Sequence, residues 1–217
     1  MNLASRWCSF YKFVSDDTFK IILDPAYSEP HRKYHNLQHI EASLNELDRH
    51  VVSDSNCNLS SEKIRSIELA IWFHDAVYNT HSRTNEFDSS QLLLKECCSH
   101  WWFRSIVDLA SKMILATEHH SIPHELSDGD RLACQYFIDI DLSVLGLPEE
   151  EYSRYEKGIR EEFGWAPDDA FAAGRCQALH RFLDREWIYN TKKFRRLYEG
   201  PARDNMNRSI IELEKQS

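Results

Sequence analysis

The sequence predicts an all-α fold, because breaks are few and apolar residues recur at helical spacing. Six glycines and six prolines are spread over 217 residues, and the alternation of β-branched residues that is typical of strands is scarce. A chain of this length can bury a substantial core without disulfides or a structural metal. Because no repeat, low-complexity tract or linker interrupts it, we expect a single domain over residues 1–217.

In the N-terminal half, capping residues and loops of turn-forming residues separate the expected helices. Asp16 or Asp17 can cap the second helix, which we expect to end before Asp24-Pro25, and a loop follows as far as Lys33. The helices expected in this half span residues 3–14, 16–23, 36–51, 64–74 and 85–97.

In the C-terminal half, Gly146 ends one helix and Pro148 opens the next, as their conformational preferences suggest. Beyond residue 171 the sequence indicates helical packing and no particular function. The other expected elements span residues 103–119, 130–145, 148–163 and 167–182, followed by a segment at 189–198 and a short helix from about Ala202.

The charge and cysteine content argue against several classes of protein. Lys and Arg number 26 against 35 Asp and Glu, and the net charge of −9 disfavours general nucleic-acid binding and a membrane-surface role. The six cysteines form no C-x-x-C pair, which disfavours a disulfide framework or a zinc knuckle. We find neither a membrane-spanning stretch nor a signal peptide, so we expect a cytoplasmic protein whose oligomeric state is open.

The stretch Trp72-Phe73-His74-Asp75 places two polar residues at the end of an apolar run. Asp is rarely buried unless it is paired or bound to a metal. At about 100° per residue, His74 and Asp75 flank the apolar stripe that begins at Ile64, so both lean toward the core. The alternative is an ordinary helix end, with His74 near the C-terminus and Asp75 beginning a turn.

Helical phase distinguishes Asp139 from Asp141, which are two residues apart and therefore face opposite sides of one helix. Asp141 falls on the apolar face with Phe137, whereas Asp139 falls near Gln135 on the other side. A carboxylate on an apolar face needs a cation or a metal. Asp141 is thus the candidate ligand, and a structural Asp paired with Arg is an equal alternative.

The same test favours His120 over His119, because His120 continues the apolar stripe that contains Leu109. A core histidine with one hydrogen bond is an alternative of similar weight. His35 and His39 are four residues apart and share a helix face, a spacing that can present two imidazoles together. That face lies away from the apolar stripe, so a solvated polar face is also open.

These candidates lie on different predicted helices and combine imidazoles with carboxylates. Such a mixed set suits Mn, Fe, Co, Ni, Zn or, less well, Mg, and four ligands leave positions open for water and substrate. The ordered set H…HD…D, formed by His39, His74-Asp75 and Asp141, resembles the HD superfamily of metal-dependent phosphohydrolases, whose fold is an all-helical bundle.

Further motifs resemble one branch of that superfamily, described as predicted metal-dependent HD-domain phosphohydrolases. The match covers about residues 30–163, and we expect residues 164–217 to pack on this core as C-terminal helices. The motifs are Arg32-Lys-Tyr-His-Asn-Leu-Gln-His-Ile-Glu, Trp72-Phe-His-Asp-Ala-Val-Tyr, Asn85-Glu86, Ala116-Thr-Glu-His-His, Phe137-Ile-Asp-Ile-Asp-Leu-Ser-Val-Leu-Gly, Tyr152-Ser-Arg-Tyr and Ile159-Arg-Glu-Glu-Phe.

The resemblance implies a divalent metal ion held by His39, His74, Asp75 and Asp141. It also places the family's histidine after Ala-Thr on His120, where histidines of related enzymes serve a second metal or the substrate phosphate. The expected activity is hydrolysis of a phosphoester, on a nucleotide or another small phosphorylated metabolite, by a metal-activated water.

Other residues receive roles in this hypothesis. Asp75 would also orient the water, and His120 or His35 would protonate the leaving oxygen or hold the phosphate. For each candidate cation, an ordinary solvated side chain is an alternative. The phosphate-binding candidates are Arg32, Lys33 and Arg83, and the residues expected to support a ligand by hydrogen bonding are Asn85 and Glu86.

Two other classes of function are open. A non-catalytic module could keep the helical fold and sense a nucleotide or metal, although the intact ligand set argues against a degenerate copy. Metal-dependent oxygenase chemistry with two irons would need more ligands. A purely structural protein is disfavoured, because it leaves the His74-Asp75 pair and Asp141 without partners.

Overall fold

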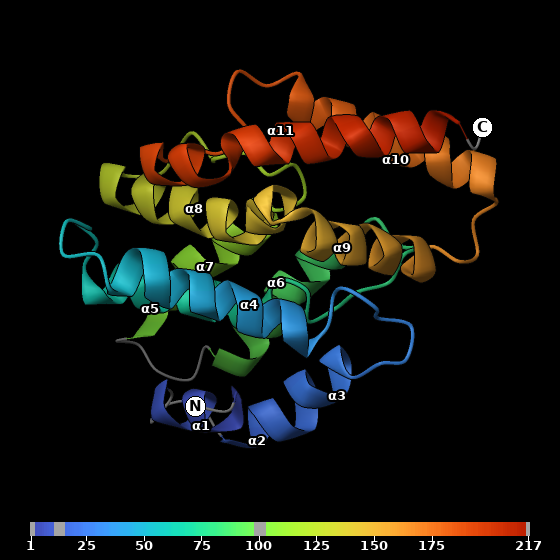
Figure 1. The fold of residues 1–217 in the computed structure, drawn as a ribbon. Helices are drawn as coiled ribbons and strands as arrows, with labels where there is room; N and C mark the ends of the chain where they lie inside the picture. Colours follow the sequence, from blue (N-terminus) through green and yellow to red (C-terminus); the bar gives the residue numbers. More distant parts are fainter. Residues whose placement is uncertain (1–2, 11–15, 98–102, 216–217) are drawn as a thin grey trace. The chain divides into compact units, whose positions relative to one another are not determined.

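The structure is a computed structural model that describes residues 3–10, 16–97 and 103–215. Within these ranges the protein consists of helices and loops and contains no strand, which confirms the predicted all-α fold (Figure 1). The chain divides into two compact units, Met1–Ile138 and Asp139–Ser217. The single domain expected from the sequence, with its core at residues 30–163, stays a prediction. In the described part of the chain, no helix has the length and apolar character needed to cross a membrane.

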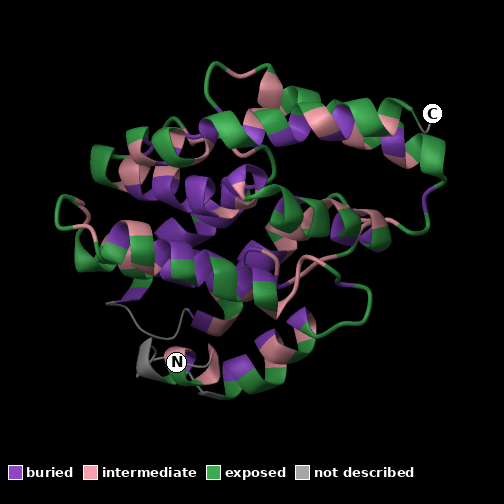
Figure 2. Cartoon of the chain, viewed as in Figure 1, coloured by how far each residue is buried: buried purple, intermediate pink, exposed green. Residues whose placement is uncertain are grey.

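In the first unit, α4, α6 and α7 pack against α5, and α6 also packs against α7. Helix α5 is buried on every side from Ser66 onward, rather than along one stripe (Figure 2). The elements of this unit are α1 (Leu3–Phe10), α2 (Asp16–Thr18), the π-helical turn η1 (Phe19–Leu23), α3 (Asp24–Tyr27), α4 (Leu37–Leu47), the π-helical turn η2 (Asp48–Val52), α5 (Ser61–Phe73), α6 (Asn85–Cys97), α7 (Arg104–Ala116) and most of α8 (Asp128–Asp141).

Local sequence explains where the helices around the candidate ligands begin. The side chain of Asn36 caps α4 by accepting a hydrogen bond from the backbone N–H of Gln38 at 2.8 Å. Ser60 caps α5 in the same way, so this helix begins three residues before the predicted Ile64. The first predicted helix reaches Phe10 in α1, and its remaining predicted residues lie outside the described ranges.

Two prolines lie inside helical segments that the sequence predicted to be interrupted. Pro25 occupies the first turn of α3, where its missing N–H needs no partner, so the predicted end before Asp24 is wrong. Helix α11 (Lys192–Glu214) continues through Pro201, and the short helix expected from Ala202 is part of it. The loss of one hydrogen bond at Pro201 does not end a helix that packs along much of the second unit.

The second unit is organised around α11, which packs against α10 and the 3₁₀ turn η4. At Gly146 the two backbones approach so closely that a Cβ atom would lie 2.6 Å from Cβ of Tyr198, and only glycine fits there. The elements of this unit besides α11 are the end of α8, η4 (Leu142–Gly146), α9 (Glu149–Glu162) and α10 (Asp168–Leu183).

Helical phase predicted that Asp139 faces away from the apolar side of its helix, and this prediction is wrong. Asp139 is fully buried. Its carboxylate accepts hydrogen bonds from the backbone N–H groups of Asn190 at 2.6 Å and Thr191 at 2.7 Å, and from the Asn190 side chain at 3.0 Å. Because Thr191 is the N-cap of α11, Asp139 satisfies donors at the start of that helix, and its burial requires no metal.

We expect Asp139→Asn to lower the free energy of unfolding by about 1–3 kcal/mol, because an amide cannot accept hydrogen bonds on both sides and leaves a buried N–H group unpaired. Urea denaturation of the metal-free protein measures this change. Asp141→Asn, at a half-buried position on the same helix, is the matched control. Equal losses in the two variants would contradict the anchoring role of Asp139.

Candidate metal centre

Three predicted ligands meet in the first unit. His39 comes from α4, His74 is the C-cap of α5, and Asp75 follows it in the turn. Nε2 of His74 lies 3.1 Å from Nε2 of His39 and 3.0 Å from Oδ2 of Asp75, and the third distance, between His39 Nε2 and Asp75 Oδ2, is 3.7 Å. Both imidazoles are buried, whereas the Asp75 side chain is 19% exposed, so solvent reaches this cluster at Asp75.

The backbone carbonyl of Ile71 selects the tautomer of His74. Nδ1 of His74 lies 3.0 Å from this oxygen, which can only accept a hydrogen bond, so Nδ1 carries the proton. In the neutral imidazole, Nε2 then holds a lone pair on the side of His39 and Asp75. Metal-bound histidines commonly have this arrangement, in which the second ring nitrogen donates to a carbonyl group and fixes the ring.

The three atoms fit a small divalent ion. Separations of 3.0, 3.1 and 3.7 Å define a triangle with a circumradius of about 1.9 Å, so one point can lie at about 2.0–2.2 Å from all three atoms. Without a proton or a cation among them, the lone pair of His74 faces the negative oxygen of Asp75, which is unfavourable.

The charge state of Asp75 suits metal binding. Burial raises the pKa of this carboxyl group, but His74, His35 and His39 together lower it more, and the resulting pKa is well below its usual range. Asp75 is therefore ionised at neutral pH and available as a ligand.

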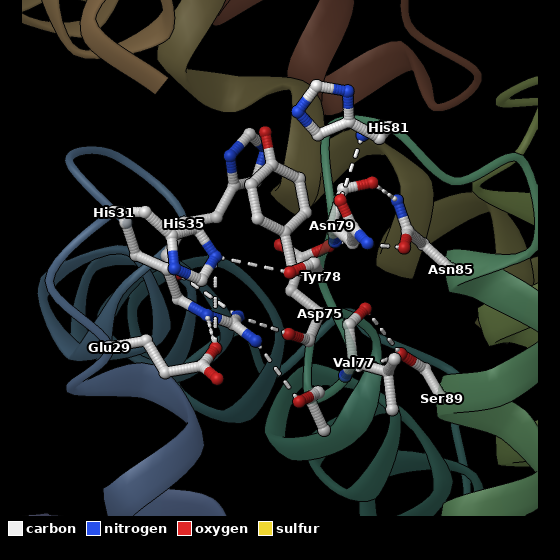
Figure 3. Close-up of polar contacts among 12 residues, drawn as sticks. Glu29, His31, His35, Asp75, Val77, Tyr78, Asn79, His81, Asn85 and Ser89 are labelled. Carbon is white, nitrogen blue, oxygen red and sulfur yellow. Dashed lines mark hydrogen bonds and ion pairs between the residues drawn. The ribbon is translucent and has the colours of Figure 1, made fainter. Parts of the chain in front are cut away.

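The loop after Asp75 is held by two side chains of α6 (Figure 3). Oγ of Ser89 accepts a hydrogen bond from the N–H of Val77 at 3.0 Å and donates one to its carbonyl at 3.2 Å. Asn85 accepts from the backbone N–H of Asn79 and donates to its carbonyl, both at 3.0 Å. Asn85, expected to support a ligand, thus acts on the loop backbone. Ser89 was not predicted, and its only sequence signal is a small polar residue in a helix.

His35 lies beside the cluster but not on α4, because the helix begins after Asn36. The predicted shared helix face of His35 and His39 is therefore wrong. Instead, the His35 ring stacks on Tyr78 with centroids 4.2 Å apart, and its centroid is 6.2 Å from that of His39. The alternative of a solvated polar face does not hold for His39, which is buried.

The three cations predicted to bind phosphate lie in different environments. Arg32 is buried, and its guanidinium group donates to Glu29 and to three backbone carbonyls, so these donors are directed at the protein and not at a phosphate. Lys33 and Arg83 are exposed in the two loops beside the cluster, and Glu86 lies in the first turn of α6. Their functional roles stay predictions.

His120 lies beyond the end of α7, so the helical phase that predicted its direction does not apply. The helix ends at Ala116, and the N–H of Ser121 donates to the Ala116 carbonyl at 3.2 Å across the turn that contains His120. His120 has a φ of 45°, and among the described residues no other non-glycine residue has a positive φ. Glycine is the usual residue at this position.

Asp141, the fourth predicted ligand, is the last residue of α8 and belongs to the second unit. It follows Phe137 by four residues, so the two side chains project from the same face of α8, as predicted. The ring of Phe137 contacts that of His74 edge-on, with centroids 5.9 Å apart.

Comparisons of the chain with protein-family models, with curated proteins and with solved structures find no match.

We expect Asp75→Ala to abolish metal binding with the helical fold retained, because the variant removes the anionic member of the cluster at a partly exposed position. Elemental analysis and circular dichroism measure the two effects. Asp108→Ala, which changes an exposed carboxylate on α7, is the control. If Asp75→Ala keeps the metal content of the parent protein, the ligand assignment is wrong.

We expect His120→Gly to raise the free energy of unfolding by about 1 kcal/mol, because glycine adopts a positive φ without steric cost. Thermal denaturation measures the change, and His119→Gly, at an exposed position, is the control. A less stable His120→Gly variant would show that the side chain contributes packing that outweighs the backbone strain.

Proposed function

We propose that this protein is a metal-dependent phosphohydrolase that acts on a nucleotide or another small phosphorylated metabolite. The observation that carries the proposal is the convergence of the Nε2 atoms of His39 and His74 and Oδ2 of Asp75 within 3.0–3.7 Å. The order of motifs, which resembles the HD superfamily, supports the same reaction class. The net charge of −9 favours a small substrate over a polynucleotide.

The resemblance to the HD superfamily also implies Asp141 as a ligand. It shares a helix face with Phe137, whose ring contacts His74. Two carboxylates and two neutral imidazoles balance the charge of a divalent ion, and a set of four leaves positions for water and substrate. His39, His74 and Asp75 are supplied by helices of the first unit or by the turn that ends one, which gives these three residues a rigid support.

A bound divalent ion would polarise a phosphoryl oxygen and lower the pKa of a water molecule. Asp75 would help to hold the ion and would also orient the attacking water. His120 or His35 would hold the phosphate or donate a proton to the leaving oxygen. Lys33 and Arg83, exposed on the adjoining loops, offset the charge of the phosphate.

We expect the purified protein to hydrolyse small phosphoesters only when a divalent metal is present, and Asp75→Ala to be inactive. A panel of nucleotides, phosphomonoesters and phosphodiesters, assayed with Mn, Fe, Co, Ni, Zn and Mg, tests this expectation. Tight nucleotide binding without hydrolysis under any metal would reject the enzyme and favour a sensor module. Oxygen consumption on titration with iron would instead indicate oxygenase chemistry.

A further inference from the structure

We infer that Arg32 is a positioning residue that fixes the two ligand-bearing segments of the centre relative to each other before a metal ion binds. The inference rests on the metal centre of the proposed function. It assigns to Arg32 a role in metal affinity, in place of the phosphate binding that the sequence predicted.

The guanidinium group of Arg32 joins both segments. One terminal nitrogen donates to the carbonyl of His35 at 3.3 Å, four residues before His39, and to the carbonyl of Asp75 at 2.5 Å. The other terminal nitrogen donates to the carbonyl of Ala76 at 3.2 Å. The entry to α4 and the turn after α5 are therefore linked by one planar group.

The surroundings of Arg32 fix the direction of these donors. Its side chain is 1% exposed, and Nε donates to the Glu29 carboxylate at 2.9 Å. The guanidinium carbon lies 5.3 Å from the ring centroid of Tyr27 and 5.4 Å from that of Tyr78. The hydroxyl of Tyr27 in turn donates to the carbonyl of Trp72, near the end of α5, at 3.0 Å. Arg32 is thus part of a network that reaches the same helix end from two directions.

Such a link matters because ligands that are already in position bind an ion at a lower free-energy cost. His39 and the His74-Asp75 pair belong to different segments of the chain, and the bonds of Arg32 join the backbone of both. A lysine at position 32 cannot replace the guanidinium, since a single ammonium nitrogen cannot bind the separate carbonyls of His35 and Ala76 along with Glu29 in the same planar geometry.

The test compares Arg32→Lys with Arg6→Lys. Arg6 is also largely buried in the first unit, and it binds Asp48 of η2 and Glu68 of α5 at 2.6–3.0 Å. We expect Arg32→Lys to weaken Co²⁺ binding by at least about 10-fold and to change the visible absorption spectrum of bound Co²⁺. Arg6→Lys should lower the thermal stability of the metal-free protein and bind Co²⁺ with the affinity and spectrum of the parent.

Competition with a chromophoric chelator measures the affinity, and thermal denaturation measures stability. Parent-like affinity and spectrum in Arg32→Lys would overturn the inference, as would an equal loss of affinity in Arg6→Lys. If Arg32→Lys does not fold, Glu29→Gln replaces it in the test, because this variant removes the carboxylate that orients Nε of Arg32. We expect Glu29→Gln to show a smaller loss of Co²⁺ affinity. Unchanged affinity in Glu29→Gln would overturn the inference.

These measurements involve no hydrolysis. A parent protein that binds Co²⁺ but hydrolyses no phosphoester would reject the proposed activity, and the affinities of the variants would still decide the role of Arg32. A parent protein that binds no metal would overturn both proposals.

Discussion

The first unit depends on one electrostatic constraint. Two imidazole nitrogens and one carboxylate oxygen, from His39, His74 and Asp75, lie within 3.0–3.7 Å of one another in a largely buried place. Burial removes hydration from the Asp75 carboxylate and raises its pKa, and the neighbouring His74, His35 and His39 offset that cost. The hydrogen bond from Nδ1 of His74 to the Ile71 carbonyl leaves Nε2 to face His39 and Asp75. In the proposed function, a divalent cation would bind all three atoms.

The surrounding structure is consistent with that constraint. Helix α5 is buried on all sides up to the position where it ends, so the backbone there has little freedom to move the ligands apart. On the far side of Asp75, the loop backbone is bonded by Ser89 and Asn85 of α6, and its first carbonyls are bonded by Arg32. Such supporting contacts position ligands before an ion arrives, which lowers the free-energy cost of binding it.

The sequence predicted the all-α fold, and it singled out His74 and Asp75, because an Asp after a long apolar run is chemically conspicuous. Helical phase failed where its assumptions failed. It does not apply to His120, since α7 ends at Ala116, and it misplaced Asp139, which is buried because the segment around Thr191 packs on that side of the helix. The sequence predicted Arg32 as a phosphate-binding residue. In the structure its acceptors include three backbone carbonyls, and no sequence pattern identifies such acceptors before the fold is known.

The proposal that His39, His74 and Asp75 form a metal centre is tested most directly by measuring how many metal ions the metal-free protein binds, and how tightly. Titration with Co²⁺ or Mn²⁺, followed by calorimetry and by the absorption of bound Co²⁺, should show at least one tightly bound ion per chain and a cobalt spectrum typical of nitrogen and oxygen ligands. His74→Ala should abolish that binding. If the parent protein binds these ions no more tightly than His74→Ala does, the cluster is not a metal centre.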